Sequence, residues 1–318
     1  MRLRVLDIIV VNWNSGNQLS QTIASIGSYC AGLVDSIIIV DNASFDCSLD
    51  AAEKILTALP FRSTIVRNIE NKGFGAACNQ GAELATAELI LFLNPDARLF
   101  ANSLMLPINF LLQSENNNIG IVGIQLIDDS GRVARSCCRF PSIGVFIAHA
   151  IGLNHLPIFS HMTIHMSEWA HDNTRVVDHV VGAFYLMRRT LFQSLNGFDE
   201  RFFVYLEDLD LSLRAQQAGY RSVFLAGAQA FHAGGGVSKQ VRAHRLFYSL
   251  RSRLLYGFKH FSWWQAWILV LVTLLVEPVT RTVFSLYDSG WDGVRNTWKA
   301  YRMLFRDLGM ILRNAKRA

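Results

Sequence analysis

The chain has 318 residues, a length that fits a catalytic domain with an appendage or two small domains. Hydrophobic residues make up 51% of it and charged residues only 17%, which excludes intrinsic disorder. The mean hydropathy of +0.23 is high for a soluble enzyme and low for a polytopic membrane protein. We therefore expect one localised apolar region.

The net charge of +5 combines an acidic body with a basic tail. Residues 1–238 carry 16 Lys and Arg against 21 Asp and Glu, a net charge of −5. Residues 239–318 carry 14 against 4, a net charge of +10, together with five of the seven tryptophans. This composition favours an anionic membrane surface as a partner. It argues against nucleic acid, because the basic residues flank an apolar run and form no polar stripe.

The five cysteines and the N-terminal residues indicate in which cellular compartment the protein is expected. The cysteines show no CxxC spacing, which predicts neither a zinc site nor a disulfide framework and favours a reducing compartment. Near the N-terminus, Asp7 interrupts an apolar run that is too short for a signal peptide. We expect that run to form the first strand.

Short apolar runs, each bounded by Asn, Asp or Gly, recur along the first hundred residues with helix-like stretches between them. This spacing predicts βαβ units, a buried parallel sheet, and a ligand site at the carboxyl ends of the strands. The predicted strands are residues 5–11, 36–40, 63–66 and 89–93, and the predicted helices are residues 17–29, 47–59 and 74–87.

The rest of the chain has a different pattern. A helix is expected to end at a C-terminal glycine, and a basic helix precedes a run of residues without charge. The predicted strands are residues 119–127, 176–187 and 222–225, the predicted helices are residues 207–218 and 240–259, and the uncharged run is residues 261–276.

Asp96 follows the strongest predicted strand, residues 89–93. A carboxylate at a strand end can bind a divalent cation that clamps a diphosphate, although capping of a following helix is the alternative. The nearby glycines of residues 71–78 predict only a turn, because Cys78 stands where a dinucleotide-binding loop requires glycine.

Three acids, Glu207, Asp208 and Asp210, lie among aromatic and aliphatic residues. Burying acids is costly unless each has a task. A helix turns by about 100° per residue, so Asp208 and Asp210 are expected to face different ways. We expect one acid to act as a base whose pKa is raised by burial, with capping of a helix N-terminus as the alternative.

His232 precedes a glycine run and is a candidate metal ligand on a loop, with a structural role as the alternative. The other clustered histidines form no HExxH motif, so we interpret them as structural. They are His149, His155, His161, His165, His171 and His179.

A series of motifs follows in order along the chain: VVNWN (10–14), IVDNASFD (39–46), NKGFG (71–75), NQG (79–81), LNPD (93–96), GAF (182–184), GFDE (197–200) with Phe203, EDLDL (207–211) with Arg214 and GY (219–220), and His232 with GGG (234–236). Together these motifs resemble glycosyltransferase family 2, on its rhamnosyltransferase-like branch. The similarity covers about residues 5–260. It implies a GT-A fold, a nucleotide-diphosphate sugar donor, a divalent cation (Mg²⁺ or Mn²⁺) and inversion at the anomeric carbon.

The resemblance also implies roles for residues that match the family motifs. Asp41 resembles the acid that hydrogen-bonds the pyrimidine base of the donor, with Asn12 and Asn14 beside that base. Lys72 and Asn79 fall in the stretch near the ribose and diphosphate.

The remaining matches concern the metal and the base. Asp96 resembles the last acid of the DxD motif, whereas Asn94 stands where many members carry Asp. Metal binding is therefore expected to depend on Asp96, His232 and the donor phosphates. Asp208 resembles the catalytic base.

These expectations define a domain layout and a reaction. We expect a GT-A catalytic domain at residues 1–238, with a nucleotide-binding half (1–100) and an acceptor and catalytic half (101–238). A helical membrane-associating tail (239–318) follows. The expected donor is dTDP-rhamnose, with a UDP-sugar as the alternative. The expected acceptor is a glycan or polyprenyl-linked glycan of cell-surface polysaccharide synthesis.

Two other function classes were weighed. A nucleotidyltransferase that makes nucleotide sugars would favour a Gly- and Lys/Arg-rich phosphate loop, which residues 10–15 lack. A non-catalytic, membrane-attached binding protein of the same fold predicts replacement of Asp96, Asp208 or His232, and all three are present.

The tail predicts a cytoplasmic enzyme attached peripherally to the inner face of the cell membrane. Three indoles within residues 261–267 favour the headgroup region, and basic residues lie on both sides of the apolar run. Glu277 and Pro278 are expected to end that run before a span is complete. A core helix, a re-entrant segment and a tilted span that includes residues 277–287 are the alternatives.

Overall fold

The computed structural model describes residues 5–159, 161–234 and 241–315. The chain forms two compact units that interleave along the sequence, whereas the predicted layout divides it once, at residue 238. The first unit comprises Met1–Arg139, His165–Glu200 and Glu207–Val237, and the second comprises Phe140–Ile164, Arg201–Leu206 and Ser238–Ala318.

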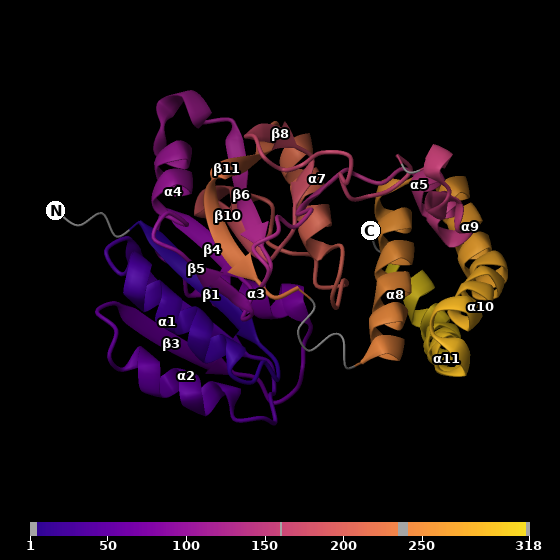
Figure 1. Ribbon diagram of the computed structural model, residues 1–318, viewed down its shortest axis with the longest axis horizontal. Helices are drawn as coiled ribbons and strands as arrows, with labels where there is room; N and C mark the ends of the chain where they lie inside the picture. The colour runs from indigo at the N-terminus through magenta and orange to yellow at the C-terminus, as the bar shows by residue number, and fades with distance from the viewer. Residues whose placement is uncertain (1–4, 160, 235–240, 316–318) are drawn as a thin grey trace. The chain divides into compact units, whose positions relative to one another are not determined.

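The first unit is built on a nine-stranded mixed sheet (Figure 1). Strands β3, β2, β1 and β4 are parallel, β10 pairs antiparallel with β4 and β6, and β11 pairs parallel with β6. At the far edge β5 and β8 pair antiparallel with β11. The strands are β1 (Leu6–Asn12), β2 (Val34–Asp41), β3 (Arg62–Arg67), β4 (Leu89–Leu93), β5 (Ala97–Leu99), β6 (Ile119–Ile127), β8 (Arg175–Val177), β10 (Phe184–Arg188) and β11 (Arg221–His232).

Helices cover both faces of this sheet, which is why its central strands are apolar on both sides. Alternate residues of β1 enter two different cores: Ile8 belongs to the core that includes residues of α1, α2 and α4, and Ile9 to the core that includes residues of α3, α6 and α7. These helices are α1 (Gln18–Cys30), α2 (Ser48–Leu56), α3 (Phe74–Glu83), α4 (Met105–Leu112), α6 (Arg189–Ser194) and α7 (Glu207–Gln217).

Helix α3 lies unusually close to the sheet. A Cβ atom added to Gly81 would lie 2.6 Å from Cγ2 of Ile9, so only glycine fits there without a shift. This close approach holds the last turn of α3 against β1 and β2.

Two expectations for the sheet were wrong in detail. Residues 176–187 do not form one strand but three short pieces, β8, β9 (His179–Val180) and β10, with different partners. Strand β9 leaves the main sheet to pair with β7 (Cys137–Cys138). Conversely, β11 is much longer than the predicted 222–225, because it pairs in turn with β6 and β5. His232 is therefore the last residue of a strand and does not lie on a loop.

The second unit is helical. It comprises α5 (Ile143–Ala150), α8 (Arg242–His260), α9 (Trp263–Leu271), a π-helical turn (Val272–Val276), α10 (Glu277–Asp288) and α11 (Gly290–Ala315). Short 3₁₀ turns lie at Leu153–His155 and Pro157–Phe159 in this unit and at Ser114–Asn116 in the first.

The apolar run does not end where the sequence predicted. Glu277 and Pro278 stand in the first turn of α10, where proline is tolerated, so the helix continues from Trp263 to Asp288. By length and composition this 26-residue helix could cross a membrane, with a mean hydropathy of 1.7 in its most apolar window.

Candidate functional site

The carboxyl ends of β1 and β2 hold a buried polar cluster. Asn12 and Asp41 are register partners, and the Asn12 amide donates to Asp41 Oδ1 at 2.7 Å and to Ser48 Oγ at 2.9 Å. Asp41 Oδ2 accepts from the Ser44 backbone N–H. Asn12 therefore orients Asp41 at the strand end, which is the place predicted for contact with a nucleobase.

Asn14 connects two loops at this edge. Its backbone lies in the left-handed region, with φ of 50°. Its N–H donates to Ser44 Oγ, and its side-chain Oδ1 accepts from the Phe45 N–H at 2.9 Å. In this structure Asn14 thus joins the loop after β1 to the loop after β2.

Asn42 was quoted in a motif but assigned no role by the sequence, and the structure gives it a central one. Its amide nitrogen donates to Asn71 Oδ1 at 2.8 Å and to the Gly73 carbonyl. Its Oδ1 accepts from the Asn68 amide and the Lys72 N–H. The glycine-rich loop is therefore fixed by one buried amide, and the exposed Lys72 side chain extends from that loop.

The Asn79 side chain is hydrogen-bonded within the protein. Its Oδ1 accepts from the Phe198 N–H, and its amide donates to the Phe198 carbonyl and to Glu200, all at 2.9 Å. This side chain clamps residues 198–200 to α3. The predicted contact with the ribose or diphosphate would compete with these three hydrogen bonds.

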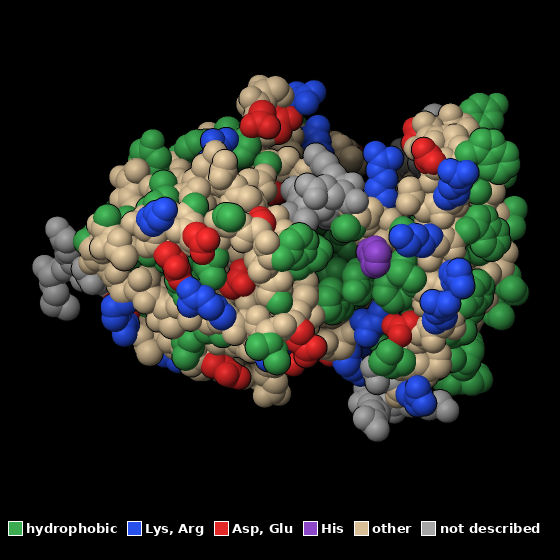
Figure 2. Space-filling view, turned by 90° about the horizontal axis from the view of Figure 1, so that it is seen from below, with side chains coloured by type: hydrophobic (Ala, Val, Ile, Leu, Met, Phe, Trp, Pro, Cys, Tyr) green, Lys and Arg blue, Asp and Glu red, His purple; other side chains and the backbone are tan. Residues whose placement is uncertain are grey.

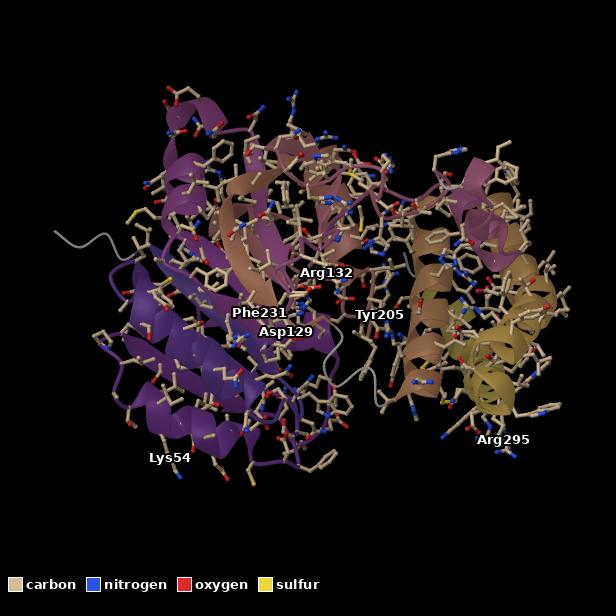
Figure 3. The ribbon with its side chains drawn as sticks, in the orientation of Figure 1. Lys54, Asp129, Arg132, Tyr205, Phe231 and Arg295 are labelled. Carbon is tan, nitrogen blue, oxygen red and sulfur yellow. The ribbon has the colours of Figure 1, made fainter. Side chains whose placement is uncertain are left out.

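Asp96 and His232 are brought together by β5 and β11. Ala97 is the register partner of His232, and the Ala233 N–H donates to the Asp96 carbonyl. Consequently Asp96 Oδ1 lies 3.3 Å from His232 Nε2, with both side chains largely buried. Next to this pair, the Arg98 guanidinium stacks over the Phe231 ring and lies 4.0 Å from Asp129. Phe231 and Asp129 are labelled in Figure 3.

The Asp96–His232 pair offers one carboxylate and one imidazole to a divalent cation. No cluster of three or more His, Cys, Asp or Glu side chains gathers anywhere in the described part of the chain. Mg²⁺ sites commonly use one or two carboxylates together with substrate phosphates. The two residues therefore fit a cation that takes its other ligands from a diphosphate and water.

Asp208 lies in the first turn of α7, after two residues, Tyr205 and Leu206, with φ of 70° and 67°. Such conformations are strained for non-glycine residues and cluster at functional sites. Its Oδ2 accepts from the Gly182 N–H at 2.9 Å, and its Oδ1 accepts from the Leu209 N–H.

The predicted direction of the base's pKa was wrong. Burial by itself raises the pKa of Asp208, but the His179 ring and the Gly182 and Leu209 N–H groups hold it below its ordinary value. Burial and the neighbouring Asp208 charge instead raise the pKa of Glu207 well above normal. Asp208 is therefore the ionised member of the pair and Glu207 the protonated one.

Asp210 has a separate, structural environment. It is completely buried and accepts from Arg214 Nε at 2.8 Å. Arg214 in turn donates to the carbonyls of Leu195 and Gly197. This network anchors the loop after α6 and leaves Asp208 as the acid that faces Gly182.

The two acidic centres are connected through Gly182 and Ala183. The Gly182 N–H binds Asp208, and the Ala183 carbonyl accepts from the Asn94 N–H in the turn that carries Asp96. Because β10 pairs antiparallel with β4, the start of one strand meets the end of the other. Asp96 and Asp208 therefore lie at the same edge of neighbouring strands.

Sequence comparison decides the family. The pattern described as "Glycosyl transferase family 2" matches residues 7–155, and the pattern described as "Glycosyl transferase family group 2" matches residues 89–317. The chain belongs to glycosyltransferase family 2. This membership favours transfer of a sugar over the two other function classes considered from the sequence.

Among curated relatives of this family 2 enzyme are two rhamnosyltransferases. It is 27% identical to N-acetylglucosaminyl-diphospho-decaprenol L-rhamnosyltransferase of Mycobacterium tuberculosis over 276 residues, 82% of this chain and 87% of that protein. It is 32% identical to rhamnosyltransferase WbbL of Escherichia coli over 151 residues, 46% of this chain and 53% of that protein.

Solved structures support the GT-A fold predicted from the sequence. Mannosyltransferase PcManGT from Pyrobaculum calidifontis, in complex with GDP-Man and Mn²⁺, matches with a TM-score of 0.55 and 15% identity over 96% of this chain and 87% of that one. S. aureus TarS 1–349 in complex with UDP-GlcNAc matches with a TM-score of 0.52 and 16% identity over 93% of this chain and 91% of that one.

Proposed function

We propose that this family 2 enzyme transfers rhamnose from dTDP-rhamnose, with inversion, to a hydroxyl of a polyprenyl-linked glycan in cell-surface polysaccharide synthesis. The observation that carries the proposal is the edge shared by Asp96 and Asp208, joined through Gly182 and Ala183. This edge brings together a candidate cation-binding acid in the turn after β4 and an ionised base at the start of α7.

Each polar group has a chemical task in such a reaction. The acceptor hydroxyl has a very high pKa, so a positioned base must take its proton as the new bond forms. Asp208 is ionised and held by two backbone N–H groups, which suits it to this role. A divalent cation held by Asp96 and His232 would neutralise charge on the leaving diphosphate.

The names of the relatives support the donor and the acceptor. Both bacterial relatives are named as rhamnosyltransferases, and the name of the mycobacterial one specifies a diphospho-decaprenol-linked sugar as its acceptor. The solved neighbours hold GDP-Man or UDP-GlcNAc, so a UDP-sugar is the alternative donor. Asp41 at the end of β2 is proposed to bind the thymine base, with Asn12 and Asn14 shaping its surroundings.

The test is a donor screen with purified full-length protein. dTDP-rhamnose, UDP-GlcNAc and GDP-mannose are each offered with N-acetylglucosaminyl-diphospho-polyprenol and Mg²⁺ or Mn²⁺. We expect transfer from dTDP-rhamnose, detected as a mass increase of the lipid, and an inverted anomeric configuration by NMR. Asp208→Asn should lower kcat by about 10²- to 10⁴-fold, while donor affinity stays near that of the wild type.

The matched control is Asp128→Asn, because Asp128 lies in a surface turn with Ser130 and Arg132. It should leave transfer unchanged. Transfer from a UDP-sugar alone would overturn the rhamnose assignment but keep glycosyl transfer. A retained configuration, or full activity of Asp208→Asn, would overturn the assigned base.

We also propose that the helical unit attaches the enzyme to an anionic membrane surface without crossing the membrane. Along the continuous helix of α9 and α10, exposed apolar side chains recur every three or four residues and so share one face. They are Trp264, Ile268, Leu271, Leu275, Val279, Val283 and Leu286, and we call them the apolar stripe.

The opposite face of this helix supports an in-plane orientation. Glu277, midway along it, is fully buried and binds Arg253 of α8 and Arg281. Helix α8 carries several arginines, so it cannot follow α10 into hydrocarbon without a large desolvation cost. A helix held at its middle to a basic neighbour in this way is suited to lie in the interface.

Charge supports an anionic surface as the partner. Figure 2 shows hydrophobic side chains along one edge of the helical unit, with Lys and Arg side chains next to them. On α11, exposed Trp291 and Trp298 alternate with exposed basic residues. These residues are Arg295, Lys299, Arg302 and Arg306.

Sedimentation with vesicles tests the attachment. The full-length protein should pellet with vesicles that contain phosphatidylglycerol, and alkaline extraction should release it. Replacing Leu271, Leu275 and Val279 with serine should abolish pelleting. The matched control replaces Met105, Leu106 and Leu112, exposed apolar residues of α4, with serine. Resistance to alkaline extraction would indicate a span, and no pelleting of the wild type would overturn attachment.

A further inference from the structure

A buried histidine lies behind the proposed base. His179, on β9, is 3% exposed, and its Nε2 lies 3.5 Å from Asp208 Oδ2. Nothing in the sequence separates it from the other histidines that we interpreted as structural. Its contact arises because β9 leaves the main sheet and pairs with β7, which brings the ring beside the first turn of α7.

The other nitrogen of this ring enters a buried hydrogen-bond chain. Nδ1 lies 2.9 Å from Ser212 Oγ, and Ser212 Oγ lies 2.8 Å from the Tyr185 hydroxyl. Ser212 and Tyr185 are both buried. The chain therefore runs from β10 through α7 to β9 and ends at Asp208.

The direction of the contact with Asp208 follows from the chemistry of the carboxylate. An ionised Asp208 only accepts, so Nε2 of His179 has to carry the hydrogen that points at it. A serine hydroxyl can donate or accept, so Ser212 Oγ can partner Nδ1 in either direction. The carboxylate therefore orients the Nε2–H, and Ser212 and Tyr185 hold the ring in place.

We propose that His179 is a positioning residue for sugar transfer: its Nε2–H fixes the Asp208 carboxylate, and Ser212 and Tyr185 hold the ring in place. This inference rests on the proposed role of Asp208 as base. With the Gly182 and Leu209 N–H groups, His179 supplies a third donor to the carboxylate. Three converging donors leave it little freedom to rotate away from an acceptor hydroxyl.

The pKa values of four other groups near His179 are shifted toward the neutral form. Cys138 is its register partner on β7, and burial keeps the pKa of that thiol far above normal. His165 contacts Cys138, and the pKa of His165 is lowered mainly by burial and to a smaller extent by the neighbouring His179. On α7 burial and the Asp208 charge raise the pKa of Glu207, and on β10 burial raises the pKa of the Tyr185 phenol. Asp208 is therefore the ionised group that His179 contacts.

The pH dependence of kcat/KM tests this inference, because its acid limb reports the ionisation of the base in the free enzyme. His179 lowers the pKa of Asp208, so its removal must raise that pKa. His179→Phe should therefore shift the acid limb to higher pH and lower kcat by about 10- to 100-fold, below the full worth of a base. His179→Gln, which keeps an N–H near the position of Nε2, should restore most of kcat and return the acid limb close to its wild-type pH.

His171 provides a matched control. It is also a buried histidine, but it accepts from the Cys137 N–H and stacks on Trp169. His171→Gln should lower the melting temperature and leave the acid limb in place. If His179→Phe does not fold, Ser212→Ala replaces it and should shift the limb in the same direction by a smaller amount.

The outcomes separate this inference from the proposed function. An inactive Asp208→Asn together with a wild-type acid limb and near-wild-type kcat in His179→Phe overturns the role of His179 alone. An active Asp208→Asn overturns the base and, with it, the basis for positioning. An acid limb that shifts equally in His171→Gln would mark the effect as general destabilisation and also overturn the inference.

Discussion

The Oδ1 atom of Asp96 lies 3.3 Å from Nε2 of His232, a separation that allows both atoms to bind one cation. The pairing of β5 with β11 creates this juxtaposition, since neither residue is near the other in sequence. We therefore expect both side chains to contribute to metal binding.

Asp96→Asn and His232→Ala should each weaken binding of Mn²⁺, measured as the loss of Mn²⁺-dependent thermal stabilisation in the presence of dTDP. Replacing a group that only supports a metal ligand typically costs about 10- to 100-fold in metal affinity, so loss of a ligand should cost at least as much. Asn94→Asp adds a carboxylate to the same turn and should tighten binding. An unchanged Mn²⁺ response in both loss variants would show that the cation binds elsewhere.

Glu207→Gln should make stability less dependent on pH. The raised pKa of Glu207 means that the folded state keeps its proton while the unfolded state loses it, so wild-type stability falls as pH rises above about 4.3. The loss has a limiting slope of about 1.4 kcal/mol per pH unit and stops above the folded-state pKa. Urea unfolding of both proteins between acid and alkaline pH measures the difference. Parallel curves would contradict a protonated Glu207.

Arg253→Met should destabilise the helical unit by about 3–5 kcal/mol, because it leaves Glu277 buried with one partner fewer. The double variant Arg253→Met with Glu277→Leu removes both charges and should recover much of that loss. The control is Arg295→Met, which breaks the exposed pair with Asp292 and should change nothing measurable (Figure 3). A double variant as unstable as the single one would argue against charge burial as the cause.

Asn79→Ala should cost about 1–3 kcal/mol, since it leaves the Phe198 N–H and carbonyl without their side-chain partner. Asn102→Ala, which removes a single exposed hydrogen bond to Gly227, is the control and should cost less. Chemical denaturation measures both. If Asn79→Ala keeps full stability but loses donor affinity, the contact with donor predicted from the sequence is the better account of Asn79.

Part of the site could be predicted from the sequence because it depends on local pattern. Apolar runs that end in Asn12, Asp41 and Asp96 predict the strand ends, and the carboxyl ends of parallel strands meet at one edge. The strands at residues 89–93 and 119–127 were predicted with the observed bounds. The motif series predicted the family and the GT-A fold, since an ordered set of motifs is far more specific than any one of them.

Only the tertiary structure decided which polar side chains meet. His179 carried no distinguishing signal, and Asn42 stood in a motif but was assigned no role, because their partners lie on elements whose neighbours depend on strand order. The direction of the pKa of Asp208 also required the fold: burial and hydrogen bonding act in opposite senses, and only the positions of His179 and Gly182 determine which prevails. Likewise, the sequence predicted that Glu277 ends the apolar run, whereas the structure shows it buried within a continuous helix and bound to Arg253.

The sequence by itself determined the strands and the chemistry available at their ends, through periodicity and residue type. Contacts between distant segments decided which groups are charged, oriented and buried, because those properties depend on the surroundings of each group.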